Sequence, residues 1–181
     1  YFPGMIENAK AGGRIRIWSA GCSSGQEPYS ISVTLNDAFP EWKQYDVRIL
    51  ATDIDPKIVE RAKCGIYSQE EANGMSIDVR NKLFDAGRAD KLVIQDRIRA
   101  PITFAELNLM QIWPFRGPFD AIFCRNVAIY FDQETQMNLW KRFADMLRPG
   151  GVLFIGHSER ITGDALQVLT GHGITTYQKA A

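Results

Sequence analysis

The sequence predicts an α/β fold: a doubly wound, mostly parallel β-sheet with a small antiparallel β insertion. Segments typical of buried strands alternate with segments of helical periodicity, as expected of parallel strands joined by crossover helices. A turn containing Gly21 and Gly25 joins the first strand to the first long helix. The alternation is interrupted at about 66–107, so we expect one domain over residues 1–181 with a small β subdomain inserted there.

The first half of the chain predicts two strand–helix units after a short helix. Pro28 suits the first turn of the long helix, and Ile31 and Leu35 recur in it at helical spacing. Asp55 is placed to cap the next helix and Gly65 to follow its C-terminal end. The expected elements are a helix over 5–10, strands over 15–20 and 47–52, and helices over 27–38 and 56–62.

Residues 66–107 are too many for a plain connection between a helix and the next strand. They contain a helical pattern at 77–83 and two alternating runs, at 91–95 and 101–104. We therefore expect a small antiparallel insertion that leads into a third main strand at about 102–106.

The last third of the chain returns to α/β alternation. Asp132 is expected to cap a helix, and the Arg-Pro-Gly-Gly segment at 148–151 is expected to form a turn. The expected elements are strands over 119–124, 152–156 and 173–177 and a helix over 133–147, with the last strand antiparallel and at an edge of the sheet.

Composition restricts the classes of function. The 21 Lys and Arg residues balance 21 Asp and Glu residues, unlike the basic excess of nucleic-acid-binding proteins. No apolar run approaches the ~20 residues of a membrane-spanning helix. The three cysteines include no CxxC pair, which is typical of free thiols in a reducing compartment, so we expect a cytoplasmic protein. With only two histidines, we expect no metal site.

A glycine-containing turn and an acidic strand end together predict an adenosine-bearing cofactor. The second strand leads to Asp53, whose carboxylate at that position suits the two hydroxyls of a ribose. The turn is Gly21-x-x-x-Gly25, not the G-x-G-x-x-G of pyrophosphate sites, and Glu27 follows at the mouth of the helix. A carboxylate there disfavours a pyrophosphate and suits an ammonium group. S-adenosylmethionine, which has an ammonium, a sulfonium and no phosphate, meets these conditions.

Longer motifs carry a resemblance to a known family. They are WSAGCSSGQEPYS at 18–30, ATDID at 51–55, NL at 108–109, GPFDAIFCRNVAIYFD at 117–132 and GHSE at 156–159. The pattern resembles the chemotaxis-receptor glutamate O-methyltransferases, the CheR family, over nearly the whole chain. The resemblance implies a Rossmann-like, class I S-adenosylmethionine-dependent methyltransferase whose product is S-adenosylhomocysteine. The cofactor-binding residues that we expect are Gly21, Glu27, Asp53, Asn108, Leu109, Arg125 and Asn126.

The resemblance also implies a substrate and a partner. Tyr130 matches the family residue near the transferring methyl group and is the candidate catalytic residue. The implied partner is the helical, glutamate-bearing cytoplasmic domain of a chemoreceptor. The 66–107 insertion corresponds to a small β subdomain that some members use to dock receptor tails. We expect a monomer with no nucleic-acid partner and no direct membrane insertion.

Two departures from the family pattern bear on activity. Gln26 stands where the family usually has the first of two glutamates, and Glu27 is retained. Family members also carry an N-terminal helical domain and a linker that supplies a threonine and an arginine to the active site. Neither is among these 181 residues, so we expect impaired activity from this chain alone.

The implied reaction is methyl transfer from a sulfonium to a glutamate carboxylate. Because the carboxylate is already an anion, no strong general base is needed, and the main task is alignment of the reacting atoms. A drier site also helps, since opposite charges are neutralised in the reaction. Tyr130 is expected to hold the attacking carboxylate by a hydrogen bond.

Three other functions stay open on the residues alone. Methyltransferases acting on amines of nucleic acids typically carry Asn/Asp-Pro-Pro-aromatic after the fourth strand, whereas Asn126 is followed by Val127 and Ala128. A non-catalytic module that binds the cofactor or a partner protein is a second alternative. An NAD-dependent oxidoreductase is a third, disfavoured by the glycine spacing.

Overall fold

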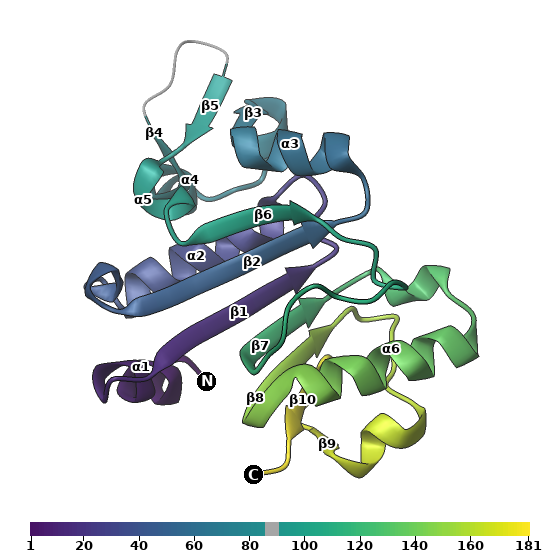
Figure 1. Cartoon of the computed structure of the whole chain (residues 1–181). Helices are drawn as coiled ribbons and strands as arrows, with labels where there is room; N and C mark the ends of the chain where they lie inside the picture. The colour runs from purple at the N-terminus through teal and green to yellow at the C-terminus, as the bar shows by residue number, and fades with distance from the viewer. Residues whose placement is uncertain (86–90) are drawn as a thin grey trace.

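A seven-stranded sheet forms the centre of the computed structural model, which describes residues 1–85 and 91–181. The strands are β1 (Arg14–Ala20), β2 (Asp46–Asp53), β6 (Ile102–Glu106), β7 (Phe119–Cys124), β8 (Leu147–Ile155), β9 (Leu169–Gly171) and β10 (Thr176–Lys179). Their order is β6-β2-β1-β7-β8-β10-β9, and the first five run parallel to one another (Figure 1). The predicted α/β class with a mostly parallel sheet is confirmed.

Helices cover both faces of this sheet. α1 (Phe2–Lys10) and α2 (Gln26–Ala38) pack on the face that carries Ile15 and Ile17 of β1, whereas α6 (Gln133–Met146) packs on the face that carries Trp18. In Figure 1, α2 lies behind the sheet and α6 in front of it. The alternation of Ile17 and Trp18 between two cores follows from the two-residue period of a strand. α3 (Pro56–Cys64) packs beside β6.

The helix ends follow the predicted capping residues. The Asp55 carboxylate accepts the N–H of Lys57 at 2.8 Å at the start of α3, and Gly65 ends that helix with φ +63°. Asp132 caps α6 in the same way through the N–H of Thr135, at 2.8 Å. Each cap satisfies a backbone donor that the helix itself leaves unpaired.

A second, three-stranded antiparallel sheet lies beside the main one. It consists of β3 (Ile66–Ser68), β5 (Lys91–Ile94) and β4 (Phe84–Asp85), in that order. Its apolar side packs with Tyr29 of α2. The antiparallel insertion expected for the fold class is therefore present, while residues 86–90 of the expected insertion lie outside the described residues. β6 pairs with β2 in the main sheet, as expected of the third main strand.

Short helices complete the described chain. They are α4 (Ile77–Leu83), α5 (Asp96–Arg99) and the 3₁₀ turns η1 (Trp42–Gln44), η2 (Glu70–Ala72), η3 (Ala128–Tyr130) and η4 (Gly163–Gln167). None of the helices formed by residues 1–85 and 91–181 combines the length and the apolar character of a membrane span.

Two expectations for the C-terminal part were wrong. Residues 148–151 form no separate turn but an irregular stretch inside β8, because β7 and β8 pair on both sides of it. Asp120 of β7 stabilises this bulge by accepting a hydrogen bond from Arg148 Nε at 2.5 Å. β10 is antiparallel as expected but is not an edge strand, because the three-residue β9 pairs with its outer side. A strand of that length leaves no clear periodicity in the sequence.

Candidate cofactor site

The candidate site lies where the strand order of the sheet reverses. From β1 the chain builds outward through β2 to β6, whereas β7 and β8 continue on the other side of β1. Ligands of open α/β sheets bind at the carboxyl ends of the strands beside such a switch point. A cleft of about 650 Å³ opens there. Its lining consists of Gly21, Ser23, Asp53, Ile54, Leu107, Asn108, Leu109, Met110, Arg125, Asn126, Val127, Tyr130 and Phe131.

The structure brings all but one of the predicted site residues into this cleft. The exception is Glu27, which lines a neighbouring cleft of about 520 Å³. Arg125 lines both clefts, and its Nη1 lies 3.5 Å from Glu27 Oε2. The predicted residues therefore line two adjoining clefts, and Arg125 is common to both.

The loop after β1 is held tightly by the end of β2. The carbonyl oxygen of Thr52 accepts the N–H groups of Gly21 and Cys22, both at 2.8 Å. Gly21 has φ +85°, and a Cβ at this position would collide with the side chain of Val127. Glycine is thus required here both by the backbone conformation and by the close approach of the loop after β7.

Asp53 occupies the end of β2 and faces two loops. Its Oδ2 accepts the N–H of Ser23 at 2.8 Å, and its Oδ1 accepts the N–H of Asp55 at 3.2 Å. A carboxylate has about four acceptor positions, so these bonds leave capacity for hydroxyl donors in the cleft. Capping of α3 is done by Asp55, which separates the roles of the two aspartates.

Glu27 sits in the first turn of α2 in a nearly enclosed position, with its side chain 19% exposed. Its Oε1 accepts a hydrogen bond from the buried Ser19 hydroxyl at 2.8 Å. Burial raises the pKa of the Glu27 carboxyl, while the Ser19 hydrogen bond and the Arg125 charge oppose that shift. A cationic ligand would therefore stabilise the charged form of this carboxylate, which burial has removed from most of its contact with water.

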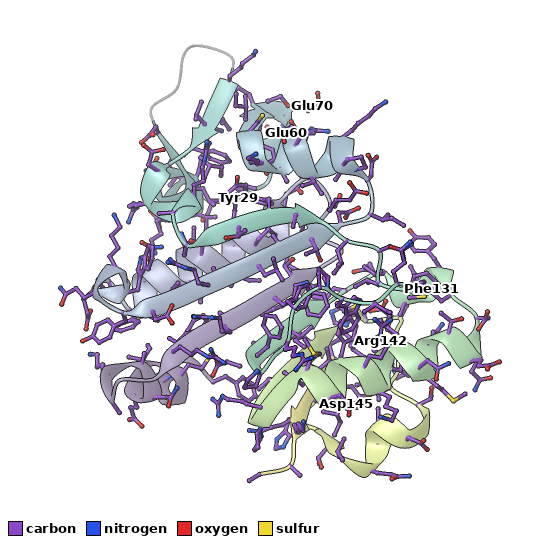
Figure 2. The ribbon with its side chains drawn as sticks, in the orientation of Figure 1. Tyr29, Glu60, Glu70, Phe131, Arg142 and Asp145 are labelled. Atoms are coloured by element: carbon purple, nitrogen blue, oxygen red, sulfur yellow. The ribbon has the colours of Figure 1, made fainter. Side chains whose placement is uncertain are left out.

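The loop after β6 is fixed from beneath by α6. Asn108 Oδ1 accepts the N–H of Met110 at 2.8 Å, which leaves the side-chain amide N–H groups free to donate. The carbonyl oxygen of Leu109 accepts from Arg142 Nη1 at 2.5 Å. Arg142 extends from α6 toward this loop (Figure 2), with its guanidinium 3.9 Å from the centre of the Trp113 ring. The hydrogen bond to Leu109 and the contact with Trp113 together hold the part of the cleft wall that Asn108 and Leu109 form.

Tyr130 stands at the mouth of the cleft. It ends η3 and is 80% exposed. Ile54 and Met110, which also line the cleft, and Ile129 of η3 are exposed large apolar residues as well. Tyr130 is thus placed to meet a second molecule rather than to pack in the core.

Sequence reasoning did not assign roles to three residues that support the site: Ser19, Arg142 and Glu159. Glu159 is buried and binds the backbone of the Asn126 loop, 33 residues earlier in the chain. Neither the helical position of Arg142 nor the strand position of Ser19 indicates a partner. Only Glu159 carried a signal in the sequence, as the last residue of the GHSE motif at 156–159, and the partners of this residue depend on the tertiary fold. Among the described residues, no group of three or more His, Cys, Asp or Glu side chains is arranged to hold a metal ion.

The fold is that of the class I methyltransferases. The chain superposes on the N-methyltransferase NodS from Bradyrhizobium japonicum, solved with S-adenosylhomocysteine, with a TM-score of 0.53 and 15% sequence identity. The match covers 99% of this chain and 85% of that one. At this identity the likeness establishes the architecture alone.

The family is established by the sequence as a whole. Residues 2–176 match the family described as CheR methyltransferase, SAM binding domain, and the chain belongs to this family. Its cofactor is accordingly S-adenosylmethionine.

Two curated relatives show how much of a longer protein the chain represents. A probable chemotaxis protein methyltransferase of Rhizobium etli is 51% identical over 97% of this chain, which covers 67% of that protein. The chemotaxis protein methyltransferase of Escherichia coli is 40% identical over 90% of this chain, which covers 58% of that protein. The chain thus spans about three fifths to two thirds of the length of these relatives.

Proposed function

We propose that this chain is the catalytic part of an enzyme that methylates glutamate side chains of chemoreceptors to glutamyl methyl esters. The observation that carries the proposal is the cleft at the switch point, since residues of the CheR-type motifs gather around it. We further propose that residues 66–107 act as a β subdomain and that the partner is the glutamate-bearing cytoplasmic domain of a receptor. A monomer that uses neither nucleic acid nor membrane insertion is part of the same proposal.

The residues present fit S-adenosylmethionine. The tight loop after β1 has a carboxylate, Glu27, in the following helical turn and therefore suits an ammonium better than a phosphate. Asp53 retains acceptor capacity for ribose hydroxyls, and Asn108 retains donors for an adenine or ribose. We assign the nucleoside to the cleft of Asp53 and Asn126, and the amino-acid end to the neighbouring cleft of Glu27.

When bound, S-adenosylmethionine supplies a methyl group on a positively charged sulfur. The protein's own part is to orient the reactants and to limit water. Glu27 accepts hydrogen bonds from the cofactor's ammonium, and Asp53 holds the ribose. Tyr130 donates a hydrogen bond from its hydroxyl to one carboxylate oxygen of the substrate glutamate and keeps the other oxygen directed into the cleft. The chain needs no general base, because the substrate carboxylate is deprotonated at neutral pH.

A methyl-transfer assay tests this function and separates it from its rivals. The whole protein, with whatever segments flank these 181 residues, is incubated with cofactor labelled in the methyl group and with the cytoplasmic fragment of a chemoreceptor, and the labelled receptor is then treated with base. A glutamyl methyl ester releases labelled methanol, whereas an N-methyl group resists base. Base-stable label on the receptor, or transfer to nucleic acid instead, contradicts the proposal. Cofactor binding without any transfer favours the non-catalytic module.

A further inference from the structure

Glu159 is a buried carboxylate that lies outside the cleft and binds the loop that lines it. The residue is 3% exposed and follows the end of β8. It accepts four backbone N–H groups: those of Gly156 at 2.5 Å, Ala128 at 2.7 Å, Val127 at 3.0 Å and Asn126 at 3.1 Å. All of its hydrogen-bonding capacity is therefore used within the protein.

The loop that Glu159 binds has a conformation that needs this support. Asn126 has φ +60°, in the left-handed region, which is unfavourable for residues with a Cβ and which Asn tolerates better than most. The consecutive N–H groups of residues 126–128 turn toward one point, an arrangement that binds anions. Here the anion is the chain's own carboxylate. The neighbouring Val127 is held close to Gly21, so the loops after β1 and β7 are fixed against each other.

Gly156 makes the close approach of Glu159 to the loop feasible. A Cβ on Gly156 would lie 2.8 Å from Glu159 Oε2 and 2.9 Å from the backbone nitrogen of Asn126, closer than side-chain carbons approach such atoms. These close contacts hold the end of β8 against the loop after β7, with Glu159 bonded to both.

We propose that Glu159 is a positioning residue for the cofactor: its carboxylate holds Asn126 and Val127 in the arrangement that the cofactor requires. The residue acts through the loop, since it is not among the residues that line the cleft. The proposal rests on the placement of the cofactor given above. The segment that follows β8, which does not line the cleft, therefore controls cofactor affinity.

The test compares Glu159→Gln with a matched control, Asp120→Asn. Asp120 is also 3% exposed and accepts hydrogen bonds from the N–H of Arg16 at 2.7 Å and from Arg148 at 2.5 Å. It lies near the amino-terminal end of β7, the end of the strand away from Asn126. Both changes replace a buried carboxylate by an amide of the same shape, and each deprives backbone or side-chain donors of an acceptor.

Affinity for S-adenosylhomocysteine is measured by calorimetric titration, and thermal unfolding of each protein is recorded alongside. Whichever way the new amide turns, Glu159→Gln leaves two backbone N–H groups without an acceptor, so we expect affinity to fall about tenfold or more. Asp120→Asn should lower thermal stability while leaving affinity within roughly twofold of the wild type. Wild-type affinity in a folded Glu159→Gln protein, or an equal loss in Asp120→Asn, overturns the proposal.

A second measurement applies if Glu159→Gln does not fold. In the wild-type chain, amide hydrogen exchange of residues 126–128 should be slow in spite of their position in a loop, because the buried carboxylate accepts their N–H groups. Rapid exchange there contradicts the proposal. Failure of the wild-type chain to bind S-adenosylhomocysteine would instead contradict the placement of the cofactor.

Discussion

Single carboxylates organise the loops at the carboxyl end of this sheet. Asp53 binds the N–H of Ser23 and so joins the end of β2 to the loop after β1. Glu159 does the same for the loop after β7. Because charge-assisted hydrogen bonds are stronger than neutral ones, a few acidic side chains can hold loops that have little apolar core of their own.

Substitutions of the two aspartates in the ATDID motif should have different effects, one on cofactor affinity and the other on folding stability. Asp53→Ala removes the proposed ribose acceptor and should weaken S-adenosylhomocysteine binding by roughly 1.5–3 kcal/mol. Asp55→Ala removes the cap of α3 and should cost about 1 kcal/mol of folding stability with little effect on binding. Calorimetry and chemical denaturation of both variants check this. Similar losses of affinity would show that the roles are assigned wrongly.

Glu27 should make cofactor binding dependent on pH. Burial raises the pKa of its carboxyl above the ordinary 4.5 in the cofactor-free protein, and a bound ammonium favours the charged form. Affinity should therefore rise as pH increases through this raised pKa and fall below it. Glu27→Gln should bind more weakly at neutral pH and show a flatter profile. An unchanged profile would exclude Glu27 as the ammonium partner.

The same shift has a consequence for stability. A raised carboxyl pKa means that the unfolded chain loses its proton first, so folding stability declines as pH rises from the unfolded pKa through the folded one. Glu27→Gln should therefore be as stable as the wild type in acid and more stable at neutral pH, as measured by denaturation at both pH values. A less stable variant at neutral pH would indicate that the Ser19 and Arg125 contacts outweigh the cost of burial.

Tyr130 should affect turnover more than binding. Its exposed ring lies at the mouth of the cleft, and its hydroxyl is assigned to the substrate. Tyr130→Phe should lower the rate of receptor methylation and leave S-adenosylhomocysteine affinity nearly unchanged. The loss should be modest, because the same hydrogen bond also stabilises the bound ground state. A large loss of cofactor affinity would place the hydroxyl on the cofactor instead.

At the level of elements, the loop after β1 depends on one glycine, and the chain offers a matched control. Gly21 and Gly12 have similar φ values, +85° and +90°, but a Cβ on Gly12 meets open space, whereas one on Gly21 meets Val127. Gly12→Ala should cost roughly 1–2 kcal/mol from backbone strain alone and keep cofactor affinity. Gly21→Ala should lose affinity as well, because the new Cβ displaces Val127, which lines the cleft. Equal affinities of the two variants, measured by calorimetric titration, would contradict this role of Gly21.

The elements themselves were largely predictable because each carries a local signal. Asp55, Gly65 and Asp132 mark helix ends by short-range chemistry, and the structure places them as the pattern indicated. The bulge in β8 was not predictable, because Pro149 and Gly150 carry the composition of a turn. Pairing with β7 on both sides keeps that segment in the sheet, and this is a tertiary effect.

At the level of the whole molecule, the order of strands creates the site. Residues that are distant from Gly21 in sequence meet it around one cleft because the parallel strands end at the same edge. The sequence motifs indicated Asp53, Asn108 and Asn126 but not the supporting contacts of Arg142 and Glu159. Those contacts depend on which loops the fold brings together, and no local pattern encodes that.

A crystal structure of the chain with S-adenosylhomocysteine tests the placement of the cofactor most directly. We expect the nucleoside in the cleft between Asp53 and Asn126, with the ribose hydroxyls bonded to the Asp53 carboxylate and the amino group near Glu27. A nucleoside bound elsewhere, or one in this cleft with its ribose turned away from Asp53, would contradict that placement.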